Sequence, residues 1–135
     1  MPKDLVLLAF DFGLRKIGVA VGQSVTQSAT PLKFLKAEKG IPNWNDIQAL
    51  IQEWRINAFV VGLPLNLDSS EQHISLAARE FANELEKRFT LPTYLIDERY
   101  SSREAKSQLR EHIDSADISI DSYAAKLILE SWFNQ

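Results

Sequence analysis

Apolar residues fill the first part of the chain at both odd and even positions. Residues 5–12 (LVLLAFDF) are apolar apart from one aspartate and end at Gly13, a pattern typical of a central strand buried on both faces. Within residues 15–22, one face carries the larger apolar residues Ile17, Val19 and Val21. The other carries the small residues Gly18, Ala20 and Gly22. This second segment predicts a strand that pairs with the first and keeps one face small for close approach by another element.

The rest of the chain alternates between short apolar runs and segments with helical spacing. The expected elements are a strand at 31–37, a helix at 42–55, a strand at 58–63, a helix at 70–89, a strand at 93–98 and helices at 101–112 and 119–133. No repeat or linker interrupts them, so residues 1–135 predict a single domain. A meander followed by strand–helix alternation predicts an α/β fold, a five-stranded mixed sheet with helices on both faces.

Composition narrows the class of protein further. With 135 residues, 45% hydrophobic and 24% charged, the chain is expected to fold as an ordinary globular domain rather than to be disordered. No apolar run approaches the roughly 20 residues of a membrane span, so no membrane partner is expected. The absence of cysteine excludes disulfides and thiol catalysis and fits a cytoplasmic location. A net charge of -3 argues, at first sight, against a nucleic-acid binder.

Three carboxylates stand at the ends of apolar elements. Asp11 ends the first strand, Glu98 ends the strand at 93–98, and Asp121 lies in the first turn of the last helix. Asp121 also begins a helical stripe, at steps of four, three and four residues, that continues with Ala125, Ile128 and Trp132. Because ligands of open α/β sheets gather at the carboxyl ends of strands, these positions are candidates for a common site.

Each carboxylate also has a simple structural explanation. Asp11 precedes Gly13 and could serve a turn. Glu98 could form an ion pair with Arg99 or Arg103, its neighbours in sequence. An aspartate at a helix N-terminus, such as Asp121, is favoured by the helix dipole alone. Taken singly, none of the three establishes a functional site.

Taken together, three carboxylates in one crevice would repel one another unless a cation neutralised them. Oxygen ligands suit Mg²⁺ or Mn²⁺, and such clusters hold two ions about 4 Å apart that cleave phosphodiesters. A basic stripe begins beside Glu98 at steps of four, three and four residues and comprises Arg99, Arg103, Lys106 and Arg110. The stripe suits phosphate contact, although a solvated amphipathic helix would show the same spacing.

Four blocks of sequence resemble the RuvX family, also called YqgF, described as pre-16S rRNA nucleases or Holliday junction resolvases. The blocks are AFDFGLRKIGVAVG (9–22), VVGLPLNLDSSEQ (60–72), IDERYSSREA (96–105) and DSYAAKLILESWF (121–133). The resemblance implies an RNase H-like fold in which Asp11, Glu98 and Asp121 form the metal-binding acidic triad. It also implies substrate contact by Arg15, Asn66 and Ser70. The chain departs from the family pattern at Gln23, Ser69 and 118–120, outside the triad.

The function expected from the residues and the resemblance is a cytoplasmic endonuclease that uses Mg²⁺ or Mn²⁺, with two ions, on structured RNA. The expected substrate is the ends of precursor 16S rRNA. One alternative is a resolvase of four-way DNA junctions, which would act as a homodimer because it cuts two symmetric strands. Another is a non-catalytic RNA-binding ribosome-assembly factor. The residues leave open whether the protein is a monomer or a homodimer.

Overall fold

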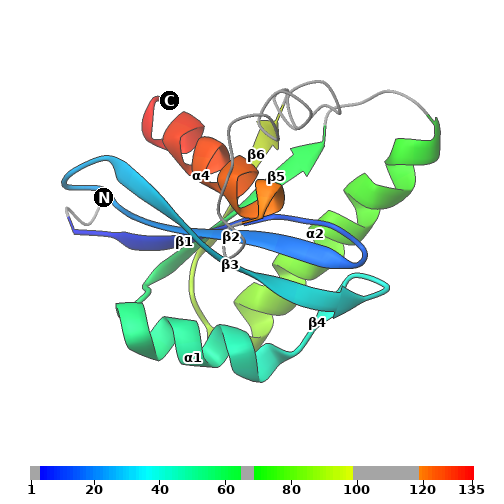
Figure 1. Ribbon diagram of the computed structural model, residues 1–135, viewed down its shortest axis with the longest axis horizontal. Helices are drawn as coiled ribbons and strands as arrows, with labels where there is room; N and C mark the ends of the chain where they lie inside the picture. Colours follow the sequence, from blue (N-terminus) through cyan, green and yellow to red (C-terminus); the bar gives the residue numbers. More distant parts are fainter. Residues whose placement is uncertain (1–3, 65–68, 99–118) are drawn as a thin grey trace.

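A computed structural model describes residues 4–64, 69–98 and 119–135 (Figure 1). In chain order its elements are β1 (Val6–Asp11), β2 (Lys16–Gln23), β3 (Ser28–Glu38), β4 (Ile41–Pro42), α1 (Trp44–Trp54), β5 (Ala58–Pro64), α2 (Ser69–Phe89), β6 (Thr93–Glu98) and α4 (Ile120–Phe133). The strands form one sheet in the order β4-β3-β2-β1-β5-β6. The first four strands pair antiparallel, whereas β5 and β6 join parallel to β1, so the expected mixed sheet is confirmed.

The sheet has six strands rather than the five expected from the sequence. The additional strand, β4, pairs two residues with Ala37 and Glu38 at the end of β3. A strand of two residues is too short to show an alternating pattern. The helix α1 begins at Trp44 rather than at the expected residue 42, because Pro42 belongs to β4. The side chain of Asn43 caps the helix by accepting a hydrogen bond from the Asn45 N–H at 3.0 Å. The expected helix at 101–112 lies outside the described residues.

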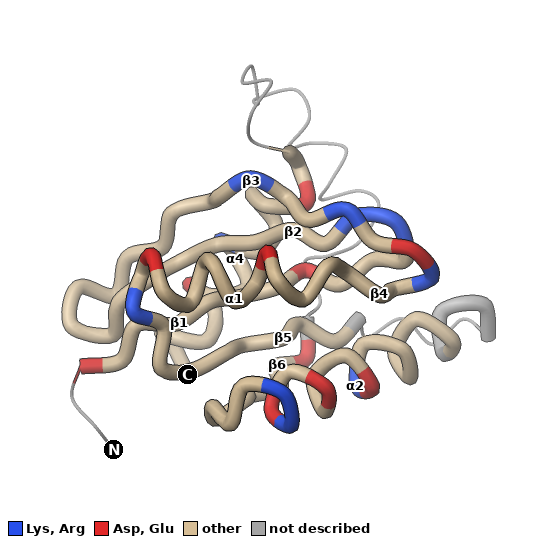
Figure 2. The backbone as a smooth tube through the Cα atoms, turned by 90° about the horizontal axis from the view of Figure 1, so that it is seen from below, with Lys and Arg blue, Asp and Glu red and all other residues tan. Residues whose placement is uncertain are grey.

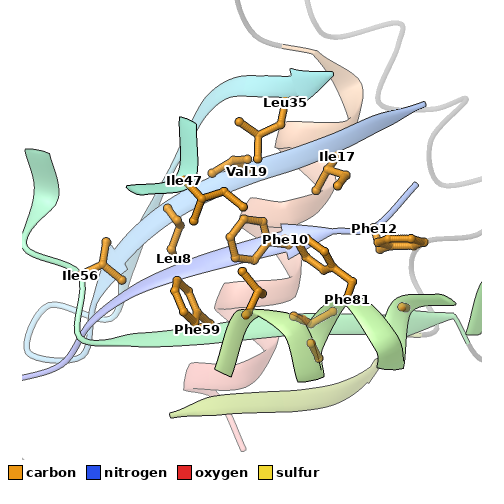
Figure 3. Packing of buried hydrophobic residues seen from close by; sticks show 14 of the residues in the cluster. Leu8, Phe10, Phe12, Ile17, Val19, Leu35, Ile47, Ile56, Phe59 and Phe81 are labelled. Atoms are coloured by element: carbon orange, nitrogen blue, oxygen red, sulfur yellow. The ribbon is translucent and has the colours of Figure 1, made fainter. Parts of the chain in front are cut away.

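Helices cover both faces of the sheet, as expected. Figure 1 shows α1 and α2 on one face and α4 on the other. Between the sheet and the first two helices lies a core in which the ring of Phe10 contacts those of Phe59 and Phe81 at centroid distances of 5.8 and 5.2 Å (Figure 3). A smaller core on the opposite face joins the sheet to Ile128 and Leu129 of α4. No helix among the described residues is both long and apolar enough to cross a membrane.

The two cores explain why β1 is apolar at every position up to Asp11. Leu8 and Phe10 belong to the core beneath α1 and α2, whereas Leu7 and Ala9 belong to the core beneath α4. Side chains alternate between the faces of a strand. Asp11 therefore follows Leu7 and Ala9 onto the face that α4 covers.

The helix α4 packs on the face of β2 that carries small residues, which the sequence predicts to be approached closely by another element. A Cβ atom added at Gly22 would lie 2.7 Å from Leu129 Cδ2 of the helix, closer than real side-chain contacts allow. Ala20, between Gly18 and Gly22, is fully buried on the same face. Small residues thus let the helix axis approach the sheet closely, which fixes where the first turn of α4 can lie.

Candidate functional site

Asp11 lies at the end of β1 between two glycines. Its register partners are Gly18 in the antiparallel strand β2 and Gly62 in the parallel strand β5. The residue is buried, with 6% of its surface exposed, and it is one of two buried polar or charged residues among those described. Neither register partner has a side chain, so the element that packs over these two glycines is the neighbour of Asp11 on this face of the sheet.

The first turn of α4 lies above Gly18. A Cβ atom on Gly18 would overlap the backbone carbonyl of Asp121 and would lie 2.6 Å from the Ser122 nitrogen. Gly18 is the register partner of Asp11, so the backbone of Asp121 lies over the strand position next to Asp11. Asp121 itself is half-buried. The structure therefore brings the backbones of two of the three predicted residues to the same edge of the sheet, although they are far apart in the sequence.

A hydrogen-bonded serine holds this helix start in place. Ser122 is fully buried, and its Oγ accepts a hydrogen bond from the backbone N–H of Val19 at 3.2 Å. The hydroxyl of Ser119, the N-cap residue, accepts a bond from the Ser122 N–H at 3.1 Å. Sequence reasoning missed Ser122, although the signal was present: it is a polar residue in helical phase with the buried Ala125 and Leu129.

The backbone of Glu98 ends β6 at the same edge of the sheet. Glu98 pairs with Pro64 of β5, two residues beyond the pair of Gly62 with Ile96, and Gly62 in turn pairs with Asp11. The Glu98 side chain is not among the described ones. Within the part of the chain that the structure describes, no three His, Asp or Glu side chains form a group that could hold a metal ion.

Among the expected substrate contacts, only the Arg15 side chain is described. It is exposed, follows the end of β1, and lines an open groove together with Lys16 and Lys36. Ser70 lies in the first turn of α2, and its side chain is not described. The remaining expected contacts lie outside the described residues: Asn66, Arg99, Arg103, Lys106 and Arg110.

The described geometry suits a hard divalent cation. The donors offered by Asp11 and Asp121 are carboxylate oxygens, which Mg²⁺ and Mn²⁺ prefer. A buried carboxylate is costly unless an opposite charge or hydrogen bonds compensate it. The N-terminus of α4, above Gly18, adds the positive end of a helix dipole, which favours an anion such as phosphate.

Curated relatives resemble the chain over its whole length. A protein of Coxiella burnetii (strain Dugway 5J108-111) named "Putative pre-16S rRNA nuclease" is 49% identical over 137 residues, which cover 100% of this chain and 97% of the relative. A protein of Legionella pneumophila (strain Paris) with the same name is 49% identical and covers 100% of this chain and 99% of its own length.

Solved structures of resolvases share the fold. T. thermophilus RuvC in complex with a Holliday junction substrate superposes with a TM-score of 0.58 at 15% identity, over 96% of this chain and 93% of that chain. The yeast mitochondrial Holliday junction resolvase superposes with a TM-score of 0.52 at 8% identity, over 94% and 78%. These likenesses confirm the RNase H-like architecture expected from the sequence.

The family model described as "RuvX: Holliday junction resolvase" matches residues 5–135, which include every element of the sheet and α4. The match agrees with the full-length identity to the curated relatives. The chain therefore belongs to the RuvX family.

Proposed function

We propose that this protein is a metal-dependent endonuclease that hydrolyses phosphodiester bonds of structured RNA and processes the ends of precursor 16S rRNA. The observation that supports the proposal is the backbone of Asp121 over Gly18, the register partner of the buried Asp11. The names of the curated relatives at 49% identity support the substrate. The absence of cysteine is compatible with the cytoplasm, where we expect the protein to act.

Asp11, Asp121 and Glu98 would hold the ions. When bound, two divalent ions would supply a nucleophile at neutral pH and charge stabilisation at the leaving oxygen of the phosphodiester. The strand register supports the third position, since the backbone of Glu98 ends β6 two residues beyond Ile96, the register partner of Gly62. Glu98 would thus complete the set of residues that holds the ions and the attacking water.

The other groups of the chain position and shield the site. Ser122 fixes the first turn of α4, and through it Asp121, by its hydrogen bond from Val19. The burial of Asp11 keeps solvent from its carboxylate, which strengthens its attraction to a cation. The positive end of the α4 dipole favours the charge that builds up on the phosphate oxygens.

A second candidate substrate is a four-way DNA junction. The description of the matching family model favours it. Because RNA and DNA present the same phosphodiester to a metal site, the carboxylates alone do not discriminate between them. A junction resolvase cuts two symmetric strands and needs two copies of the site, so this candidate requires a homodimer, whereas trimming of rRNA ends can be performed by a monomer.

Cleavage of a precursor 16S rRNA fragment and of a four-way junction, measured side by side with Mg²⁺ or Mn²⁺, tests both candidates. We expect RNA cleavage by the wild type and loss of at least a hundredfold in rate for Asp11→Asn, the order seen when one transition-state stabilising group is removed. Asp46→Asn, at the start of α1 and remote from the site, is the matched control and should keep full activity. Equal cleavage by Asp11→Asn and wild type would overturn the assignment.

A non-catalytic RNA-binding factor is the third possibility, from a different functional class. It predicts RNA binding without cleavage and no stabilisation by divalent ions. A ligand that binds only the folded state must raise its stability. Thermal unfolding with and without Mn²⁺ therefore separates this possibility from both nucleases.

A further inference from the structure

An open groove of about 1140 Å³ runs beside the β1–β2 turn and the β3–β4 hairpin. The residues of this basic groove that matter here are Arg15, Lys16, Phe34, Lys36, Glu38 and Lys39. Four of these six are cations and one is an anion, which gives a local charge of +3 in a chain whose net charge is -3. Figure 2 shows Lys and Arg positions gathering along β3 and around the hairpin that leads to β4. The groove is therefore positively charged although the chain as a whole carries a net negative charge.

Two of the lysines face each other directly. Lys16 of β2 is the register partner of Lys36 of β3, and both are exposed. Like charges directly opposite each other in an antiparallel pair are destabilising. An anion bound between them would convert this repulsion into attraction, so the pair indicates a ligand that carries negative charge.

An aromatic ring positions one of these ammonium groups. The Lys16 Nζ atom lies 4.9 Å from the centroid of the Phe34 ring, a cation–π contact. Phe34 is half-buried, so the ring is held by its surroundings while its charged partner stays at the surface. The contact restricts the flexible lysine side chain to the groove.

The groove adjoins the carboxylates. The pairing of β2 with β3 shifts between Ile17 and Val19, so that residues 33 and 34 of β3 both lie opposite Gly18, the residue beneath Asp121. Ile17 and Leu35 belong to the core beneath α1 and α2, and alternation therefore places Lys16 and Lys36 on the α4 face. Lys16 is two residues from Gly18, about 7 Å along the strand.

We propose that the basic groove binds the phosphodiester backbone of the substrate strand next to the scissile bond, with Lys16 and Lys36 contacting phosphates and Phe34 positioning Lys16. This inference rests on the proposed nuclease function and adds to it the path of the substrate, from Asp11 and Asp121 across Gly18 toward β3. Lysine contacts to phosphate carry no base information, so the groove contributes affinity and register rather than sequence specificity.

The test is binding of a fluorescently labelled precursor 16S rRNA fragment, measured by anisotropy over a range of KCl concentrations. The variant is Lys16→Gln/Lys36→Gln, and the matched control is Lys87→Gln, in the last turn of α2 at the opposite end of the sheet. Each phosphate contact with a single strand contributes about 0.7 to the slope of log affinity against log salt. We expect the double variant to lower the slope by about 1.4 and the affinity by on the order of tenfold at 0.1 M salt. The control should match the wild type.

Phe34→Leu tests the positioning role separately. A cation–π contact at an exposed site corresponds to a roughly two- to fivefold change in affinity. We expect a loss of that size with an unchanged salt slope, because the number of phosphate contacts stays the same. A lowered slope, or unchanged affinity, would contradict a positioning role for the ring.

The outcomes separate this inference from the function on which it rests. If the wild type cleaves the RNA and the double variant keeps its affinity and salt slope, the groove is not the path of the substrate and the nuclease assignment stands. If the wild type neither binds nor cleaves the RNA, both fail.

An acidic protein segment is the other ligand that the positive charge of the groove would attract. Equal displacement of the RNA by polyglutamate and by unlabelled RNA, at matched charge, would overturn the proposal in favour of such a partner.

Discussion

The hydroxyl of Ser122 accepts a hydrogen bond from the backbone N–H of Val19 at 3.2 Å, between residues that are 103 positions apart in the sequence. This bond joins the first turn of α4 to β2 next to Gly18, where the strand passes between β1 and the irregular part of β3. Asp121 precedes Ser122, and Asp11 pairs with Gly18. The hydrogen bond between Val19 and Ser122 therefore fixes the backbone of Asp121 relative to the strand position of Asp11.

Ser122→Ala should lower both stability and activity. The variant leaves the buried N–H of Val19 without this acceptor, which costs about 1–3 kcal/mol in the free energy of unfolding. The activity should fall further than the stability loss explains, because Asp121 is no longer held in register with Asp11. Urea unfolding and cleavage rates measured below the unfolding transition check the two effects. Ser131→Ala, near the other end of α4, is the control, and the same loss in both variants would contradict the role given to Ser122.

Gly18→Ala should disrupt the packing of α4 on β2. The added methyl group would overlap backbone atoms of Asp121, which cannot move aside as the end of a flexible side chain could. Overpacking typically costs 1–3 kcal/mol, and we expect a loss of about 3 kcal/mol or more together with loss of cleavage. Thermal unfolding and far-UV circular dichroism measure the change. Ser28→Ala, at the exposed start of β3, provides a strand control. A Gly18→Ala protein as stable as the wild type would show that α4 does not pack here.

Mn²⁺ should raise the unfolding temperature of the wild type but not that of Asp11→Asn. A ligand at a hundred times its dissociation constant stabilises the folded state by about 2.7 kcal/mol. That energy corresponds to a shift of several degrees for a domain of this size. The amide of the variant offers one neutral oxygen in place of a carboxylate. Differential scanning fluorimetry in a Mn²⁺ series gives the result, with Asp46→Asn as the control. An equal shift in Asp11→Asn would place the ions elsewhere.

Lys36→Gln should stabilise the folded protein while it weakens RNA binding. Removing one of two like charges that face each other across β2 and β3 should raise the free energy of unfolding by about 0.2–1 kcal/mol. The gain should shrink as salt is added, because screening already weakens the repulsion between exposed charges. Denaturant unfolding at low and high KCl measures it, with Lys87→Gln as the control. Lower stability of Lys36→Gln at low salt would mean that the two ammonium groups do not repel each other in the folded state.

Much of the fold can be predicted from the sequence because its signals are local. The continuous apolar run that ends in Asp11 predicts a central strand, and the small residues Gly18, Ala20 and Gly22 predict a strand face that another element approaches closely. The strand β4 could not be predicted, since two residues show no period, and neither could the start of α1 at Trp44, which depends on the cap at Asn43. Both exceptions depend on how the β3–β4 hairpin closes, at Lys39 and Gly40 with φ angles of 53° and 80°.

The candidate carboxylates follow from the sequence for the same reason, since a charged residue that ends an apolar element is visible without coordinates. The hydrogen-bond partner of Ser122 and the pairing of Lys16 with Lys36 could not be found in this way. Their significance depends on which residues face each other, and pairing register is a property of two strands rather than of one segment.

The sequence by itself determined the types and order of the described elements other than β4, and it singled out the three carboxylates as candidates, because hydrophobic period and charge can be read from each segment alone. Only the tertiary structure decided that the backbone of Asp121 lies over Gly18, the register partner of Asp11, and that cations line a groove at the nearby ends of β2 and β3 in a chain of net charge -3. The physical reason is that both the repulsion between charges and the contact between backbones depend on distance in space. That distance is set by strand register and by the seating of α4 on the sheet, not by separation along the chain.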